Sequence, residues 1–248
     1  MKIYGLLGNP LGHSFSQRYF AEKFQRENIV DCSYVNFEAP DLHLKIEALK
    51  SDPNLCGLNV TIPYKTQILS HLDIASLTCQ EIGACNCIKV FKEKWTGFNT
   101  DITGFEKTFL PKLKSYHSKA LILGTGGSSK AVVYVLKKLG IEYLFISRKK
   151  NASLNIIGYN DLTLDILSEY KIVINTTPLG MFPDINNSPV IPYEFVSAEH
   201  YFFDLIYNPE LTLFLAQAKN KGAAIENGKN MLSIQAEESW RIWNDENL

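Results

Sequence analysis

A glycine-rich turn in the middle of the sequence has the residue types needed to hold the phosphates of a dinucleotide. Gly124, Thr125, Gly126 and Gly127 follow an apolar run and precede a helix that we predict to begin at Ser128. Glycine lets the backbone approach a pyrophosphate, and a helix N-terminus offers free N–H groups and a positive dipole end. The pattern therefore predicts a dinucleotide site, although a simple tight turn between strand and helix has the same glycines.

The residues after the next predicted strand indicate which dinucleotide binds. An Asp or Glu at this place would bind the ribose 2′-hydroxyl and suit NAD. The sequence instead has Ser147, Arg148, Lys149 and Lys150. Because a guanidinium presents a rigid fork of donors to a phosphate, Arg148 predicts a contact with the 2′-phosphate of NADP. A solvated loop of charged residues is the alternative interpretation.

Four short polar motifs precede the nucleotide-binding pattern. They are Gly8–Ser16, Asn59–Lys65, Gly83–Cys87 and Asn99–Asp101. Each motif alone is ordinary. Ser14 and Ser16 suit a turn or a helix N-cap, and Asp101 suits the cap of a helix that begins near Ile102. Lys65 alone suits the solvated surface of a helix. What the motifs mean therefore depends on their combination.

Together, and in this order, the motifs resemble the shikimate dehydrogenase family. The resemblance also covers Asn175–Met181, Asp204–Tyr207 and Asn227–Ala236, so it runs nearly from end to end. It implies an α/β protein of two domains with a cleft between them: an N-terminal substrate-binding catalytic domain and a Rossmann-type NADP-binding domain. On this basis we expect the substrate-binding domain at residues 1–102 plus 231–248 and the NADP-binding domain at 103–230.

The activity implied by the resemblance is the reversible, NADP-dependent reduction of 3-dehydroshikimate to shikimate, on the pathway to chorismate and the aromatic amino acids. Lys65 and Asp101 would form the catalytic pair. The substrate-binding residues would be Ser14, Ser16, Thr61, Lys65, Asn86, Asp101, Tyr207 and Gln235. The cofactor-binding residues would be Gly124, Thr125, Gly126, Gly127, Ser128, Ser147, Arg148, Lys149, Leu205 and Gly228.

These residue types suit the chemistry. Reduction of a ring ketone needs a hydride, which a nicotinamide cofactor supplies, and a proton for the oxygen. Lys65 can donate that proton or stabilise the developing alkoxide, while Asp101 orients the lysine. Serine hydroxyls such as those of Ser14 and Ser16 give directed donors to a carboxylate.

The sequence departs from the usual family pattern at several positions. Gln17 stands where proline is usual, Cys87 where threonine is common, and Lys149 where threonine or serine often follows the arginine. Ser128–Lys130 replaces a stretch richer in alanine. None of these departures removes a residue of the predicted catalytic pair.

Three alternatives remain at this stage. A quinate/shikimate dehydrogenase of dual specificity would share Lys65, Asp101 and the glycine-rich turn. A non-catalytic ligand-sensing homologue is the second, because fold does not imply function. The third is another two-domain NADP enzyme, such as a methylene-tetrahydrofolate dehydrogenase, against which the hydroxyls of Ser14 and Ser16 argue.

The elements that must position these residues alternate between strands and helices, which indicates βαβ units and a mainly parallel sheet. In the first part we predict strands at Lys2–Leu7, Ser33–Phe37 and Cys56–Val60, and helices at Phe15–Asn28 and Asp41–Lys50. In the second we predict strands at Ala120–Leu123, Tyr143–Ser147, Ile172–Asn175 and Tyr201–Leu205, and a helix at Ser128–Leu139 that Gly140 ends.

Composition sets the remaining expectations. The chain has 248 residues, of which 46% are hydrophobic and 21% charged, with a formal net charge of -1. This balance gives no basic field for nucleic acid, and no apolar stretch reaches the roughly 20 residues that span a bilayer. Five cysteines without a C-x-x-C pair, and five unclustered histidines, predict no metal site. We therefore expect a cytoplasmic protein whose partner is a small-molecule substrate. Composition does not indicate the oligomeric state, so a monomer and a homodimer both stay open.

Overall fold

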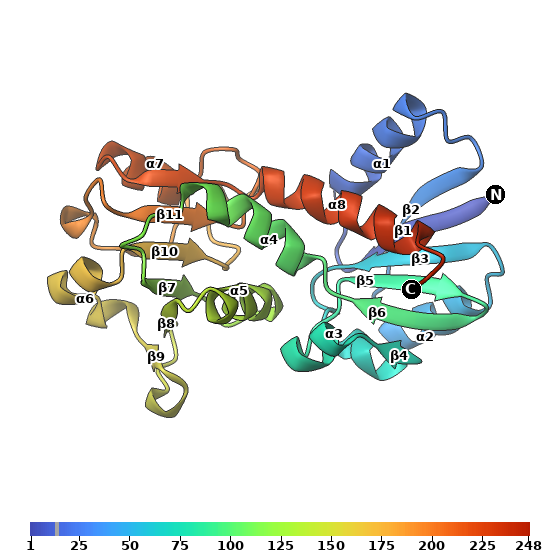
Figure 1. Ribbon diagram of the computed structural model, residues 1–248, viewed down its shortest axis with the longest axis horizontal. Coiled ribbons are helices and arrows are strands. Elements are labelled where there is room, and N and C mark those ends of the chain that lie inside the picture. Colours follow the sequence, from blue (N-terminus) through green and yellow to red (C-terminus); the bar gives the residue numbers. More distant parts are fainter. Residues whose placement is uncertain (13–14) are drawn as a thin grey trace. The chain divides into compact units, whose positions relative to one another are not determined.

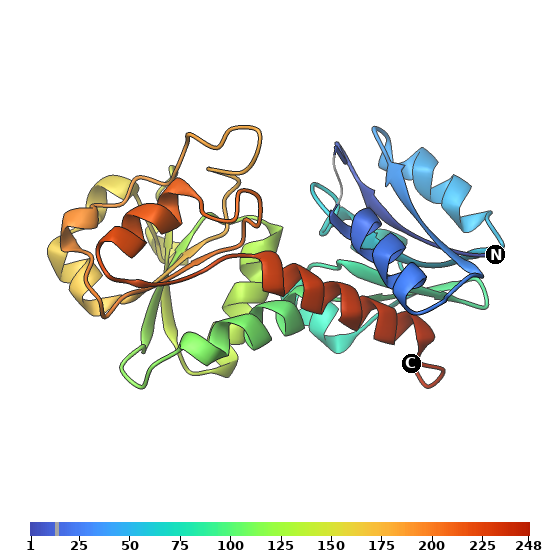
Figure 2. The ribbon, with the colours of Figure 1, turned by 90° about the horizontal axis from the view of Figure 1, so that it is seen from above.

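The computed structural model describes residues 1–12 and 15–248, which divide into two compact units (Figures 1 and 2). Unit 1 comprises Met1–Thr103 and Ser233–Leu248, and unit 2 comprises Gly104–Leu232. The chain passes between the units inside two helices, α4 (Asp101–Phe109) and α8 (Lys229–Asn244). That one domain binds substrate and the other NADP stays a prediction.

Unit 1 contains a six-stranded mixed sheet with the order β2-β1-β3-β5-β6-β4. Its strands are β1 (Lys2–Gly8), β2 (Cys32–Glu38), β3 (Leu55–Val60), β4 (Ile74–Ala75), β5 (Cys87–Phe91) and β6 (Lys94–Phe98). β1 pairs in parallel with β2 and β3, whereas β5 is antiparallel to both β3 and β6. The parallel strands agree with the sequence analysis, which predicted neither β5 nor β6.

Both faces of this sheet are covered. Side chains alternate along β1, so Leu7 belongs to one core and Tyr4 to the other. The first core also takes residues from α2 (Leu42–Lys50), α3 (Leu77–Ile82) and the 3-10 helix η1 (Gln67–His71). The second core packs α1 (Phe15–Arg26) beside α8, with Phe20 stacked on Tyr34 and close to Trp243. Packing in these two cores fixes the positions of the strands whose ends carry the polar motifs.

Unit 2 contains a six-stranded, fully parallel sheet with the order β12-β11-β10-β7-β8-β9. Its strands are β7 (Lys119–Leu123), β8 (Glu142–Ile146), β9 (Ile156–Ile157), β10 (Ile172–Asn175), β11 (Tyr201–Asp204) and β12 (Ala224–Glu226). Its remaining helices are α5 (Gly127–Lys138), α6 (Leu164–Glu169) and α7 (Leu213–Asn220), with 3-10 turns at Leu110–Lys112, Ala152–Leu154, Tyr159–Asp161 and Tyr193–Phe195. The predicted α/β fold with a Rossmann-type sheet is confirmed.

The central strands of unit 2 are apolar because both of their faces are covered. All four residues of β10 and of β11 are buried. Such strands read as continuous hydrophobic runs, as in Ile172–Ile174. α5 follows β7 directly, and Gly140 (φ +69°) ends its C-terminal turn as predicted. Among the described helices, none is both long and apolar enough to cross a membrane.

Candidate active site

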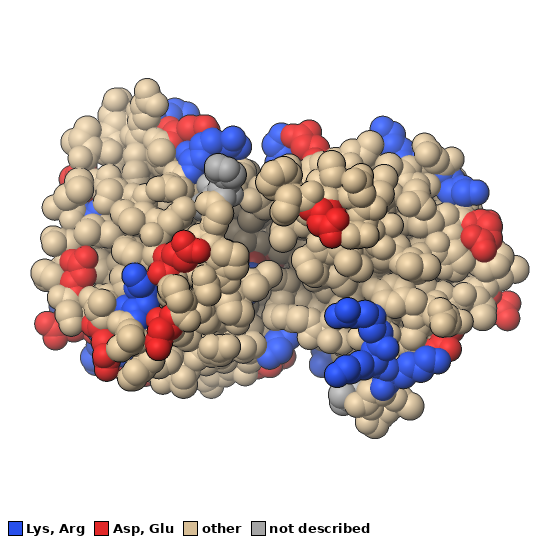
Figure 3. Space-filling view, turned by 180° about the vertical axis from the view of Figure 1, so that it is seen from behind, with Lys and Arg blue, Asp and Glu red and all other residues tan. Residues whose placement is uncertain are grey.

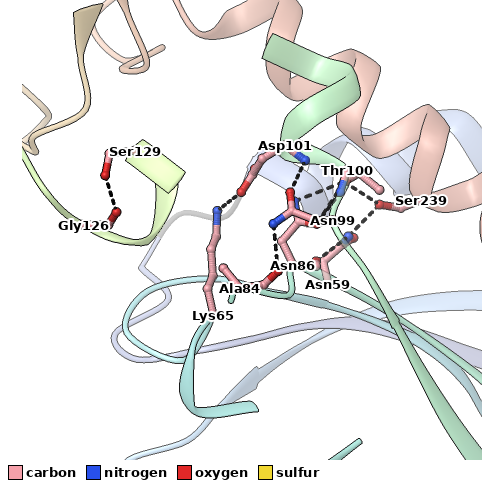
Figure 4. Close-up of polar contacts among 10 residues, drawn as sticks. All are labelled: Asn59, Lys65, Ala84, Asn86, Asn99, Thr100, Asp101, Gly126, Ser129 and Ser239. Carbon is pink, nitrogen blue, oxygen red and sulfur yellow. Dashed lines mark hydrogen bonds and ion pairs between the residues drawn. The ribbon is translucent and has the colours of Figure 1, made fainter. Parts of the chain in front are cut away.

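Lys65 and Asp101 form an ion pair in unit 1, with 2.7 Å between Lys65 Nζ and Asp101 Oδ2 (Figure 4). The side chain of Asp101 is only 3% exposed and that of Lys65 14%. A partly buried pair is screened by water far less than a surface pair. The two residues are 36 positions apart in sequence, and the fold brings them into contact.

Lys65 lies in the turn between β3 and η1, which is anchored to two strand ends. Thr61 N–H donates to Leu7 O at 2.9 Å, and the buried Tyr64 hydroxyl donates to Ala39 O. Gly8 allows this close approach, because a Cβ at that position would stand 2.4 Å from the methyl carbon of Thr61. The lysine therefore projects from a fixed turn, and the side chain of Thr61 packs beside the end of β1.

Asp101 is the first residue of α4, immediately after a buried polar segment. Its N–H donates to Asn99 Oδ1 at 3.1 Å, and Asn99 Nδ2 donates to Ala84 O at 3.0 Å. The amide of Asn99 thus fixes where α4 begins. The carboxylate of Asp101 is directed to Lys65 (Figure 4), so its position is explained by more than helix capping.

Asn86 is held beside this segment by the β5–β6 hairpin. Thr100 N–H donates to Asn86 Oδ1 at 2.6 Å, and Asn86 Nδ2 donates to Thr100 Oγ1 at 3.1 Å. Asn86 immediately precedes β5 and Thr100 lies just after β6, so strand pairing brings the two together. Three of the predicted substrate residues, Lys65, Asn86 and Asp101, therefore lie within one hydrogen-bonded cluster.

The remaining predicted substrate residues are distributed as follows. Ser14 lies outside the described residues. Burial raises the pKa of the Tyr34 hydroxyl, and an interaction with Ser16 opposes part of this increase. Gln235 is half-buried on α8 in unit 1, whereas Tyr207 is half-buried and belongs to unit 2.

The unusual Gln17 has a partner in the structure. Its Oε1 accepts a hydrogen bond from Asn36 Nδ2 on β2 at 2.9 Å. The proline that is usual in the family would stiffen the chain through its fixed φ. A side-chain bond to the neighbouring strand restrains the start of α1 in a different way.

Sequence reasoning gave no role to two polar residues of this cluster, Ser239 and Asn59. The fully buried Ser239 on α8 accepts a hydrogen bond from Asn59 Nδ2 at 2.8 Å. Asn59 Oδ1 in turn accepts from the Tyr34 hydroxyl at 2.9 Å. A signal was available for Ser239, because it lies four residues after Gln235 and therefore on the same face of a helix.

The glycine-rich turn of unit 2 connects β7 to α5 as predicted, although the helix begins one residue earlier, at Gly127. Gly124 has φ +96°, a backbone conformation that favours glycine. A Cβ there would also stand 2.8 Å from the methyl carbon of Thr177, so both the conformation and the space exclude a larger residue. The neighbouring Thr125 and Gly126 are exposed. The first helical turn therefore begins at an open surface, which fits a phosphate.

Ser128 and its neighbour continue this turn. Ser128 is half-buried in the first turn of α5, whereas Ser129 is buried and its hydroxyl donates to Gly126 O at 2.7 Å. The small side chain of Ser129 thus packs against the turn, at a place where dinucleotide-binding turns have a small residue so that helix and strand can pack closely. The geometry of the turn is therefore compatible with Ser128–Lys130 in place of a stretch richer in alanine.

The basic run after β8 presents its charges to solvent. Arg148, Lys149 and Lys150 are all exposed, and Lys149 N–H donates to the hydroxyl of Ser147 at 3.4 Å. Lys150 is paired with Asp161 at 2.6 Å. Charges of both signs are spread over the face in Figure 3, with one gathered group of Lys and Arg. The exposed guanidinium of Arg148 fits the prediction of a phosphate contact.

Leu205 and Gly228, two further predicted cofactor residues, lie against each other. A Cβ on Gly228 would stand 2.1 Å from Leu205 O, and Gly228 N–H donates to Ile206 O at 3.0 Å. Only glycine therefore permits the chain before α8 to cross the loop that follows β11. This crossing sets the position of the Leu205–Tyr207 segment.

Asp204 holds the loops at the carboxyl ends of β10 and β11. It is fully buried and accepts hydrogen bonds from Asn175 Nδ2, Ile206 N–H and the Thr212 hydroxyl. Burial raises the pKa of its carboxyl to about 7, and the three donors oppose this increase. Asn175 Oδ1 also accepts from both the N–H and the hydroxyl of Thr177, so the two loops are joined.

The polar residues of the two units differ in what they offer. Unit 1 supplies a partly buried ammonium–carboxylate pair with amide and hydroxyl groups around it, which suits proton transfer to an oxygen. Unit 2 supplies a glycine turn and an exposed guanidinium, which suit phosphates. Within the described ranges, no group of three His, Cys, Asp or Glu residues could hold a metal ion.

Comparison with known proteins gives consistent matches. A family model described as the shikimate dehydrogenase substrate binding domain matches residues 6–88. A shikimate dehydrogenase (NADP(+)) of Caldicellulosiruptor saccharolyticus is 38% identical, covering 99% of this chain and 93% of the relative. One of Methanococcus vannielii is 36% identical, covering 97% and 90% respectively.

A solved structure agrees with these sequence matches. It is the shikimate 5-dehydrogenase of Thermus thermophilus in complex with NADP(H) and shikimate, which has a TM-score of 0.86 and 30% identity. The alignment covers 98% of this chain and 94% of that one.

Proposed function

Because the chain belongs to the shikimate dehydrogenase family, we propose that it interconverts 3-dehydroshikimate and shikimate with NADP as its cofactor. It is an oxidoreductase that acts on a CH–OH group. In the biosynthetic direction, 3-dehydroshikimate, NADPH and a proton give shikimate and NADP⁺. The product serves the synthesis of chorismate and the aromatic amino acids.

We assign substrate binding to unit 1, which corresponds to the domain expected at residues 1–102 plus 231–248. The single observation that carries the proposal is the Lys65–Asp101 pair, with its 2.7 Å contact and low exposure. Ser14, Ser16, Thr61, Asn86 and Gln235 of the same domain, together with Tyr207, are proposed to bind the carboxylate and ring hydroxyls.

Lys65 and Asp101 act on the reacting oxygen. When the substrate ketone is reduced, negative charge develops on its oxygen, and the Lys65 ammonium donates a proton or stabilises that charge. The Asp101 carboxylate fixes the ammonium through their hydrogen bond, so the donor is in place before reaction. In the reverse direction the same lysine accepts the proton of the shikimate hydroxyl.

We assign the cofactor to unit 2, in the domain expected at residues 103–230. When bound, NADP supplies or accepts the hydride. Arg148 and Lys149 are proposed to contact its 2′-phosphate and to select it over NAD, because both follow β8 and are exposed. The pyrophosphate is proposed to lie at the first turn of α5. The other cofactor contacts are proposed to be Gly124, Thr125, Gly126, Gly127, Ser128, Ser147, Leu205 and Gly228.

Location and assembly follow from the proposed role. An enzyme of amino-acid biosynthesis works where its soluble substrates and NADP are found, so we propose a cytoplasmic enzyme. We propose a monomer or a homodimer whose partners are its substrate and cofactor, with no nucleic acid or membrane involved.

A steady-state assay of the purified protein tests this function directly. Formation of the reduced cofactor is followed by absorbance, with shikimate or quinate crossed against NADP⁺ or NAD⁺. We expect turnover chiefly with shikimate and NADP⁺. Turnover chiefly with quinate or NAD⁺ would instead place the protein among dual-specificity enzymes, and no turnover in any combination would favour a ligand-sensing role.

A further inference from the structure

Ser239 lies at the meeting point of three elements of unit 1. It is fully buried on α8, and its hydroxyl donates to Gln235 O at 2.8 Å, one helical turn earlier. The same oxygen accepts from Asn59 Nδ2 on β3 at 2.8 Å and lies 3.5 Å from Thr100 Oγ1 (Figure 4). A serine hydroxyl has one donor and two acceptor sites, so the bonds with Gln235 and Asn59 use the donor and one acceptor. The hydroxyl also interacts with the thiol of Cys87.

The first branch from Ser239 runs through Asn59 to Ser16. Asn59 Oδ1 accepts from the buried Tyr34 hydroxyl, which fixes the orientation of the amide and directs its Nδ2 to Ser239. The Nδ2 also lies 3.4 Å from Asn86 O. Burial raises the pKa of the Tyr34 hydroxyl, and an interaction with Ser16 lowers it in part. Asn59 therefore uses both ends of its amide to join Ser239 with the segments that carry Ser16 and Asn86.

The second branch runs through Thr100 to the catalytic pair. Thr100 exchanges two hydrogen bonds with the side chain of Asn86, at 2.6 and 3.1 Å. It immediately precedes Asp101, the partner of Lys65. A shift of Thr100 would therefore displace both Asn86 and the residue that orients the lysine.

A buried hydroxyl on a helix does not need such partners. Thr108 on α4 is also buried, and its hydroxyl donates to Gly104 O at 2.8 Å, four residues earlier. That backbone bond alone is enough to satisfy a helical hydroxyl. The two extra side-chain contacts of Ser239 come from other elements, and each leads to residues proposed to hold the substrate.

We propose that Ser239 is a positioning residue of the substrate site, which fixes Asn59 and Thr100 and, through them, Asn86 and Asp101. This inference rests on the proposed function and names a residue to which no role in it has yet been given. Replacing Ser239 by alanine leaves the Asn59 Nδ2 donor without its buried acceptor, and the cost of such a group is relieved only if Asn59 or its neighbours move.

The test compares Ser239→Ala with the unmodified protein in the shikimate and NADP⁺ assay. We expect the KM for shikimate to rise by roughly 5- to 30-fold, the effect of one misplaced buried hydrogen-bonding group. We expect the KM for NADP⁺ to stay unchanged, because the proposed cofactor residues lie in unit 2. Thr108→Val is the matched control, because it removes a buried helical hydroxyl that has no role in the site.

A second variant approaches the same amide from its other side. Tyr34→Phe keeps the buried ring and removes the hydroxyl that orients Asn59 and interacts with Ser16, so we expect the KM for shikimate to rise here too. Ser239→Cys keeps a weak hydrogen-bonding group and should recover part of the loss. If Ser239→Ala does not fold, an unchanged KM for shikimate in Tyr34→Phe would overturn the positioning role, because the site would then not depend on the orientation of Asn59.

The results separate the two proposals. If the unmodified protein lacks shikimate-dependent turnover, the proposed function fails. If it turns over and a folded Ser239→Ala variant has an unchanged KM for shikimate, only the positioning role fails. Equal increases in the KM values for shikimate and NADP⁺, or the same change in Thr108→Val, would show a general structural effect and would also overturn the positioning role.

Discussion

At the scale of single residues, the Lys65–Asp101 pair is the most direct subject for substitution. We expect Lys65→Ala to lower kcat by at least about 100-fold, the usual contribution of a general acid, while the KM for shikimate changes little. Steady-state assays with shikimate and NADP⁺ measure kcat and the KM for shikimate separately. Lys94→Ala is a suitable control, because Lys94 is an exposed lysine on β6. An undiminished kcat in Lys65→Ala would remove this lysine from the mechanism.

Arg148 determines the choice of cofactor in our proposal. Loss of a charged hydrogen bond costs about 1.5–3 kcal/mol, so Arg148→Ala should raise the KM for NADP⁺ by roughly 10- to 150-fold. The KM for NAD⁺ should hardly change, because NAD⁺ lacks the 2′-phosphate. Lys150→Ala provides the control, since Lys150 is an adjacent exposed cation that already pairs with Asp161. Equal effects on both cofactors would contradict a role in phosphate recognition.

Asp204 predicts a pH dependence of stability. Its pKa is raised from 3.8 to about 7 in the folded chain, chiefly by burial. Folding therefore favours the protonated carboxyl, and this contribution to stability is fully present below the ordinary pKa and is lost as the pH rises through about 7. The side-chain amide introduced by Asp204→Asn does not titrate, so this variant lacks the effect.

Denaturant unfolding of the unmodified protein and of Asp204→Asn, over a series of pH values, measures this effect. The difference in unfolding free energy should favour the unmodified protein most at acid pH and should shrink by a few kcal/mol as the pH approaches about 7. An unchanging difference would mean that Asp204 titrates alike in the folded and unfolded chains.

The catalytic pair and the positioning serine differ in how far sequence reveals them. Lys65 and Asp101 were predicted because their motifs resemble a known family, and the structure brings their side chains into contact. Their roles stay a prediction. Ser239 was not predicted, because a serine in a helix is ordinary. Only the fold shows that Asn59 and Thr100 meet at its hydroxyl.

At the scale of elements, the β5–β6 hairpin is one of the parts of the fold that sequence reasoning did not find. Its two turn residues, Lys92 and Glu93, have φ values of 49° and 63°. Tight hairpins with this conformation usually have Asn-Gly or Asp-Gly in the turn, and that signal is missing here. The parallel strands were easier to find, because burial on both faces gives them continuous apolar runs such as Leu121–Leu123.

The same turn yields a prediction for stability. A side chain in the left-handed region costs about 1–2 kcal/mol, whereas glycine avoids this strain at a smaller entropic cost. Glu93→Gly should therefore raise the melting temperature by about 1–3 °C and leave kcat unchanged. Thermal unfolding followed by circular dichroism measures the shift. Glu93→Ala, which keeps a Cβ, should show no such gain, and a lower melting temperature for Glu93→Gly would show that the turn is not strained.

At the scale of the whole molecule, the residues proposed to bind substrate and cofactor fall in two units, of which unit 1 is formed from both ends of the chain. Lys65, Asn86, Asp101 and Ser239 belong to unit 1, whereas the Gly124–Gly127 turn and Arg148 belong to unit 2. Alternation of strands and helices was enough to predict the α/β class. The chain changes units inside α4 and α8 and not in a linker, so composition alone does not mark these positions.

This division predicts that the two ligands stabilise the protein through separate residues. A ligand that binds only the native state adds about 2.7 kcal/mol at 100 times its dissociation constant, so shikimate and NADP⁺ should each raise the melting temperature. In Arg148→Ala the shift caused by NADP⁺ should shrink while that caused by shikimate remains. In Ser239→Ala the reverse should hold. Thermal-shift measurements with each ligand alone give all four values, and Lys150→Ala should retain both shifts. If either variant lost both shifts to the same degree, the assignment of substrate to unit 1 and cofactor to unit 2 would be wrong.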